Sequence, residues 1–201
     1  KDVAWHDGWP FTADDVVFTV EAIKDPDYQG SPAMGELWQT VTVAKLNDHQ
    51  VRFGLQEPLA SFVEFTTIEI APAHLLAAVP ADELPSHPFN ATPIGTGPFK
   101  LREATLERAV LEMNANYYGV RPFLSEIRFR FYSSFTEALA ALERGEVQGI
   151  RSLQPEMLAN TRAQARLSIY SQADYSKLTL LIMNDRSPFF EDERVRRALA
   201  H

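Results

Sequence analysis

Cysteine is absent from the sequence, and this absence removes several kinds of chemistry. Disulfide bonds, thiolate metal ligands and a cysteine nucleophile are all excluded. Long apolar runs are absent as well, since none approaches the ~20 residues of a membrane-spanning helix. The first residues, KDVAWHDG, lack the basic start and apolar stretch of a signal peptide, so we expect no targeting segment within them.

Basic residues are scarce relative to acidic ones. The sequence has 19 Lys and Arg against 27 Asp and Glu, which gives a formal net charge of -8. Nucleic-acid binding needs clustered Lys and Arg to meet the phosphates, and no such stripe is present. We therefore predict no nucleic-acid partner. With 45% apolar and 23% charged residues, the composition is typical of a globular protein with a real core.

The usual catalytic and metal-binding patterns are also missing. No two of the five histidines have the spacing that places two ligands on one helical face, so we predict no metal site and no cofactor. There is no GxSxG elbow, and Gly95-Thr96-Gly97 lacks the GK[ST] ending of a phosphate loop. One catalytic alternative stays open: an α/β hydrolase-like enzyme that uses His6 and Asp7. It requires these side chains to be free to act beside a pocket.

The first half of the sequence predicts a helix and a β-hairpin. Thr12 with Asp15 three residues later is close to a capping box, and an apolar stripe at helical spacing follows. Residues 41–46 and 49–55 alternate apolar and polar side chains, which predicts two strands. Asn47-Asp48 between them is a candidate two-residue turn.

The second half alternates strands with helices, which favours an α/β layer and a mixed α+β fold class. Gly145 is expected to end the helix of residues 136–144. A second helix is expected at residues 155–162. Strands are expected at residues 99–102, 109–113, 127–131, 147–150, 167–170 and 178–183.

Several phrases of the sequence occur in the order in which they occur in one protein family. They are WHDGWPFTADDVVF from Trp5, IGTGPF from Ile94, NANYY from Asn114, GEV from Gly145, and the stretch from Asn184 through Pro188-Phe189 to RVRRAL. Together they resemble the extracytoplasmic solute-binding proteins of ABC importers, the group that includes oligopeptide, dipeptide and nickel binders. Gln148 departs from the pattern, because an Asp is usual there.

This resemblance implies an internal fragment of a two-lobed periplasmic-binding-protein type II fold. Residues 1–92 would be the extra domain of lobe one, containing the helix and hairpin, and residues 93–178 its α/β layer. Residues 179–201 would be a crossover strand and helix into a second lobe that this sequence lacks. The sequence starts in patterned residues and stops inside an expected helix, which also indicates a fragment.

The resemblance also implies a function and a set of ligand contacts. The protein would be a binding component and not an enzyme. It would close two lobes around a small solute, a peptide in the first instance, and deliver it to a membrane permease. Nickel complexes and sugars stay open as ligands, and the location would be the periplasm or a cell-surface lipoprotein. The ligand-binding candidates are Ser31, Pro32, Arg151, Ser152, Leu153, Gln154, Tyr175, Ser176, Lys177 and Leu178.

A further alternative is an isolated protein-interaction domain that acts through the hairpin edge or an exposed apolar patch. A fragment would also expose apolar faces where the missing lobe packed. A second copy of the chain could cover them, so self-association is an expected property of the fragment.

Overall fold

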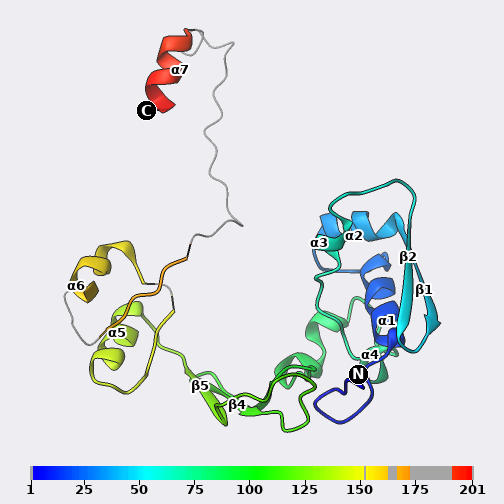
Figure 1. Cartoon of the computed structure of the whole chain (residues 1–201), viewed down its shortest axis with the longest axis horizontal. Helices are drawn as coiled ribbons and strands as arrows, with labels where there is room; N and C mark the ends of the chain where they lie inside the picture. Colours follow the sequence, from blue (N-terminus) through cyan, green and yellow to red (C-terminus); the bar gives the residue numbers. More distant parts are fainter. Residues whose placement is uncertain (1, 152, 163–166, 173–191, 201) are drawn as a thin grey trace. The chain divides into compact units, whose positions relative to one another are not determined.

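The computed structural model describes residues 2–151, 153–162, 167–172 and 192–200 (Figure 1). The chain divides into two compact units, residues 1–147 and 148–201, and each is described by itself. The predicted boundaries after residues 92 and 178 remain predictions. No helix among the described residues is long and apolar enough to cross a membrane.

Helix α1 (Ala13–Lys24) begins at the capping box that the sequence predicted. The Thr12 hydroxyl accepts from the Asp14 N–H at 3.3 Å, and the Asp15 carboxylate accepts from the Thr12 N–H at 2.8 Å. These contacts satisfy backbone donors that the first helical turn leaves without partners. Asp15 is only 3% exposed, and Thr19, one turn later on the same face, is 6% exposed. The face of α1 that carries Asp15 and Thr19 is therefore turned toward the protein interior.

A second helix and a hairpin close this core. Helix α2 (Pro32–Gln39) carries the fully buried Trp38, and strands β1 (Val41–Asn47) and β2 (Gln50–Leu55) pair antiparallel. The Trp38 ring lies 5.8 Å from both Phe53 and Phe62, at tilted and edge-on angles that aromatic pairs prefer. Trp38, Val20 and Val41 form the buried centre of this region.

The hairpin turn lies one residue later than predicted. Strand β1 extends to Asn47, and the turn is formed by Asp48 and His49. The Asn47 carboxamide oxygen accepts from the His49 N–H at 2.9 Å, and its amide group donates to Gln50 at 2.8 Å. An Asn side chain that bonds the backbone two residues on is a turn in its own right, which shifts the turn from the predicted Asn47-Asp48.

Short helices follow the hairpin. They are α3 (Phe62–Phe65), α4 (Ala73–Leu76) and the 3-10 helices η1 (Leu84–Ser86) and η2 (Pro88–Ala91). Two buried side chains of α1 hold the segment before α4. The Asp15 carboxylate accepts from the Ala73 N–H at 2.8 Å, and the Thr19 hydroxyl accepts from the Ala71 N–H at 2.9 Å. The N-terminal edge of α4 is thereby fixed against α1.

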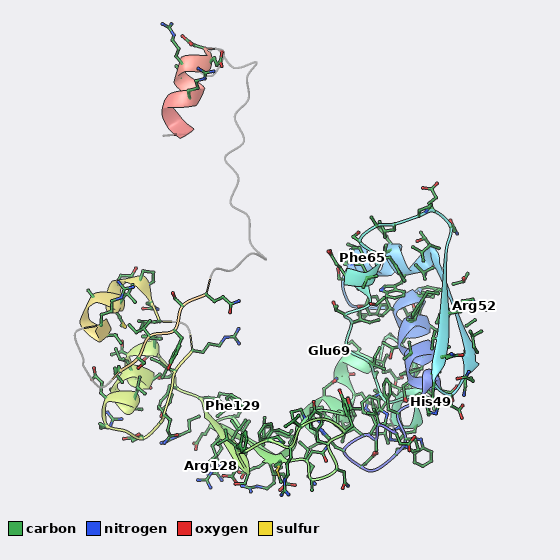
Figure 2. All side chains as sticks on the ribbon, viewed as in Figure 1. His49, Arg52, Phe65, Glu69, Arg128 and Phe129 are labelled. Atoms are coloured by element: carbon green, nitrogen blue, oxygen red, sulfur yellow. The ribbon has the colours of Figure 1, made fainter. Side chains whose placement is uncertain are left out.

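The predicted strands at residues 99–102, 109–113 and 127–131 form one antiparallel sheet. It is ordered β3 (Phe99–Ala104), β4 (Arg108–Met113) and β5 (Glu126–Arg130). Arg128 and Phe129, labelled in Figure 2, are successive residues of β5 and so belong to opposite faces. One face carries mostly charged side chains around the buried Val110, and the other is apolar. Helix α5 (Phe135–Glu143) follows, and Gly145 after it has φ +77°, as its predicted helix-ending role requires.

The second unit is mainly helical where it is described. It contains η3 (Pro155–Met157), α6 (Leu158–Arg162) and α7 (Glu193–Ala200). The predicted strands at residues 147–150 and 167–170 are wrong, because these described residues form no strand pairing. A strand needs a neighbour to bond its backbone, and an apolar alternating pattern does not supply one. The predicted strand at residues 178–183 lies outside the described residues.

Candidate functional site

The WHDGW turn contacts the IGTG turn through the imidazole of His6. The Gly95 N–H donates to His6 Nδ1 at 3.0 Å, and His6 Nε2 lies 3.1 Å from the Gly97 carbonyl oxygen. The backbone adds a third bond, from the His6 N–H to the Gly95 oxygen at 2.9 Å. Residues about ninety positions apart are therefore joined by both the side chain and the main chain of one histidine.

Asn114, the residue directly after strand β4, completes this contact. Its carboxamide nitrogen donates to the same Gly97 oxygen at 3.1 Å, and its backbone N–H donates to the Pro98 oxygen at 2.8 Å. Asn114 is 7% exposed, so its polar atoms need such partners. Three of the motifs that carry the family resemblance thus meet at one carbonyl group. We call His6, Gly95, Gly97 and Asn114 the motif junction.

A second cluster joins the WHDGW turn to α4. The Asp7 carboxylate lies 2.7 Å from His74 Nε2 and accepts from the Trp9 N–H at 3.0 Å. The Trp9 ring stacks on the His74 ring at 5.2 Å with an 11° interplanar angle. Desolvation by burial raises the pKa of Asp7, but the hydrogen bonds from His74 and the Trp9 N–H outweigh it, so the pKa lies below its usual value. Asp7 is therefore held as a carboxylate.

This geometry does not support the hydrolase-like alternative. Both nitrogens of His6 are engaged by the IGTG turn, while Asp7 bonds to His74 and Trp9, so the two residues form no catalytic pair. A cleft of about 360 Å³ lies nearby, but neither residue lines it. Its lining residues are Asp2, Val3, Phe11, Thr12, Ala13, Val16, Asp48, His49 and Val51. Within the described residues, no group of three or more His, Asp or Glu is placed to hold a metal.

The predicted ligand-binding residues fall into three groups. Ser31 and Pro32 are exposed at the N-terminal end of α2, in the first unit. Arg151 and Gln154 are exposed and Leu153 is half-buried just before η3, in the second unit. Ser152, Tyr175, Ser176, Lys177 and Leu178 lie outside the described residues. Their assignment to one binding site remains a prediction.

Sequence patterns did not predict that the motif junction is a physical contact. The sequence singles out His6 only as a catalytic candidate with Asp7, and Asn114 only as a part of the NANYY phrase. The signal was nevertheless present, because each residue lies in a motif that resembles the same family. Motifs that occur together yet lie far apart in the chain are candidates for spatial contact.

The chain belongs to the family of bacterial extracellular solute-binding proteins, family 5 Middle, which it matches over residues 1–201. This match confirms the predicted family and the mixed fold class.

The relatives include peptide-binding and nickel-binding proteins. Oligopeptide-binding protein AppA of Bacillus subtilis is 30% identical over 204 residues, which cover 99% of this chain and 37% of AppA. The structure of that protein with a nonapeptide has a TM-score of 0.67 at 33% identity, over 73% of this chain and 30% of AppA. NikZ of Campylobacter jejuni, solved with Ni(L-His), has a TM-score of 0.72 at 25% identity, over 98% of this chain and 39% of NikZ. The chain thus spans well under half the length of these relatives.

Proposed function

We propose that the chain is part of the substrate-binding component of an ABC importer. This component captures an oligopeptide or similar solute by closing two lobes about a hinge, and it delivers the solute to a membrane permease. The observation that carries the proposal is the family match over the whole chain, in which the matching motifs also meet in space at His6, Gly97 and Asn114. In this role the WHDGW turn is structural, and the protein is not an enzyme.

An oligopeptide is the first ligand to test. AppA of Bacillus subtilis is described as an oligopeptide-binding protein, and its structure contains a nonapeptide. NikZ has a similar fold and holds a nickel-histidine complex, so the fold alone does not select the ligand. The candidate loops around Ser31 and Arg151 offer hydroxyl, guanidinium and backbone groups that suit a peptide backbone. The proposed location is outside the cytoplasm, either in the periplasm or as a cell-surface lipoprotein.

A ligand panel tests this function. The complete gene product that contains the chain is titrated by calorimetry with peptides of two to nine residues, nickel-histidine and an oligosaccharide. We expect saturable binding of peptides and weaker or no binding of the other two. Saturable binding of only the nickel complex or the sugar would overturn the peptide assignment. No binding of any of the three would contradict the proposed function.

A matched pair of variants tests the predicted site. The double variant Arg151→Ala/Gln154→Ala removes two exposed polar side chains before η3, and it should weaken peptide binding by about fivefold to thirtyfold at roughly 1 kcal/mol per hydrogen bond. The control Arg162→Ala removes an exposed arginine from the neighbouring helix α6 and should leave the affinity unchanged. Equal affinities for the double variant and the control would exclude this loop from the site.

The sheet also supports the expected self-association of the chain. Phe99, Leu101, Leu111, Ile127 and Phe129 belong to the apolar face of β3, β4 and β5, and none of them is fully buried. Two copies would cover these faces against each other. Light scattering of the chain should show a dimer or larger species, and Phe129→Glu should shift it toward monomer. A wild-type monomer at high concentration would contradict this part of the proposal.

A further inference from the structure

The His6 ring is held by two hydrogen bonds of opposite polarity. The Gly95 N–H is a donor, so Nδ1, which lies 3.0 Å from this nitrogen, must accept. The Gly97 carbonyl oxygen can only accept, so Nε2, at 3.1 Å from it, must carry the hydrogen. The partners therefore assign one form of the side chain, the neutral imidazole with its hydrogen on Nε2.

The protonated ring does not fit this arrangement. An imidazolium carries N–H groups on both nitrogens, so its Nδ1–H would face the Gly95 N–H. The Gly95 donor would lose its acceptor, and two donors would be brought together at a nitrogen–nitrogen distance of 3.0 Å. The bond to Gly97 could persist, but the pairing of His6 with Gly95 could not.

Among the described residues, the hydrogen-bond partners of the His6 ring carry no charge that would offset this loss. Gly95 and Gly97 have no side chain, and the Asn114 side chain that shares the Gly97 oxygen is uncharged. Asp7 is the adjacent ionisable residue in the sequence, but its carboxylate bonds to the Trp9 N–H and to His74. Within the described part of the chain, the His6 ring therefore has no hydrogen-bonded carboxylate that would favour the protonated form.

The bonds of His6 link parts of the first unit that are distant in sequence. His6 lies ahead of helix α1, whereas Gly95 and Gly97 lie in the turn that leads into strand β3. The ring nitrogens bridge separations of 89 and 91 residues. Breaking the bridge would loosen the connection between the region of α1 and the three-stranded sheet.

We propose that His6 is an acid-sensitive lock within the motif junction. The neutral ring holds the IGTG turn against the WHDGW turn, and uptake of one proton at Nδ1 releases the Gly95 N–H. Opening at Gly95 is therefore coupled to proton uptake and becomes easier as the pH falls. The proposal rests on the geometry of this junction and is independent of the ligand that the protein binds.

Hydrogen exchange at the Gly95 amide tests this coupling in the chain as it stands. After correction for the intrinsic exchange rate, the opening equilibrium at Gly95 should rise as the pH falls, by up to about tenfold per pH unit, because one proton is taken up on opening. In parallel, ¹⁵N spectra of labelled histidine should show His6 as the Nε2–H form while Gly95 is protected. An imidazolium signal from His6 with the Gly95 amide still protected would overturn the proposal.

Two histidine variants separate this lock from other effects of acid. His6→Gln retains a side-chain N–H that can reach the Gly97 oxygen, but it cannot take up a proton in this range, so its exchange should lose the steep pH dependence. His49→Gln is the control, because His49 is exposed in the hairpin turn (Figure 2), and it should keep the wild-type dependence. Equal pH dependence in wild type and His6→Gln would overturn the proposal. If His6→Gln does not fold, the wild-type exchange and spectra decide alone.

Discussion

Replacing Asp15 by alanine should destabilise the first unit far more than replacing its neighbour Asp14. The Asp15 carboxylate is buried and accepts two backbone hydrogen bonds at 2.8 Å, from the Thr12 N–H and from the Ala73 N–H. The first caps α1, and the second fixes the start of α4 against it. Asp15→Ala removes both acceptors and leaves two N–H groups without partners in a largely buried place.

The size of the effect follows from these two bonds. Loss of a helix cap costs about 1 kcal/mol, and a buried N–H left without its acceptor costs about 1–3 kcal/mol, so a total of about 3 kcal/mol is expected. For a unit that ends at residue 147, an unfolding entropy near 2.1 cal/mol/K per residue converts this loss to a drop of about 10 °C in the thermal midpoint. Circular dichroism during heating measures that midpoint.

Asp14→Ala is the matched control. It removes the same charge from the same helical turn, but the Asp14 side chain is 61% exposed, and its partner Lys45 keeps a second carboxylate, Asp48, at 2.7 Å. Its midpoint should therefore change by about 2 °C or less, as for other exposed ion pairs. Similar decreases in the thermal midpoint for Asp14→Ala and Asp15→Ala would refute the reasoning. The interaction of a negative charge with the helix dipole, which both variants lose, would then explain the two results without the buried hydrogen bonds.

Three further outcomes are expected. Because the pKa of Asp7 is lowered in the folded state, its hydrogen bonds with the Trp9 N–H and with His74 stabilise the fold above the unfolded pKa of about 3.9, and this contribution is lost as the pH falls through the folded pKa. Asp7→Asn should thus lower the free energy of unfolding, measured by urea titration, by on the order of 0.5 kcal/mol at pH 7 but not near pH 2; an equal loss at both pH values would contradict this. Trp38→Ala removes the largest fully buried side chain among the described residues and should lower the free energy of unfolding by about 3–5 kcal/mol. Loss of near-ultraviolet dichroism and a lower urea midpoint would report this change, and a loss below about 1 kcal/mol would show that the core lies elsewhere. Gly145→Ala places a side chain at φ +77° and should lower the thermal midpoint by about 3 °C, at roughly 1 kcal/mol for this conformation; an unchanged midpoint would mean that the turn after α5 adapts freely.

Local signals in the sequence predicted the elements whose causes are local. Thr12 and Asp15 cap α1 within four residues of each other, and the alternating strands β1 and β2 are joined by a short turn. The three strands of the second sheet also follow from alternation along each strand. The turn was misplaced by one residue because the Asn47 side chain bonds to the His49 N–H, a choice that composition at the turn does not reveal.

Contacts between distant residues were not predictable in the same way. Asp15 was read as a capping residue, but its second oxygen accepts from Ala73, which is 58 positions away. The motif junction likewise depends on His6 meeting Gly97 across 91 positions. Helical spacing and strand alternation describe neighbours along the chain, so they carry no information on such pairs. The failed strands at residues 147–150 and 167–170 have the same cause, since pairing is a tertiary property.

The candidate ligand residues rest on the family resemblance more than on pattern. Ser31, Pro32, Arg151 and Gln154 are exposed, as ligand contacts in an open site can be, but exposure is equally common in ordinary loops. No charge run, metal spacing or nucleophile singles them out. Binding measurements on Arg151→Ala/Gln154→Ala test their role directly.

Calorimetric titration of the complete gene product with a nonapeptide tests the central claim most directly. The account predicts a saturable heat of binding with a stoichiometry of one, weakened by Arg151→Ala/Gln154→Ala and unaffected by Arg162→Ala. Absence of any saturable binding of peptide, nickel-histidine or oligosaccharide by the folded protein would contradict the claim that it is a solute-binding component.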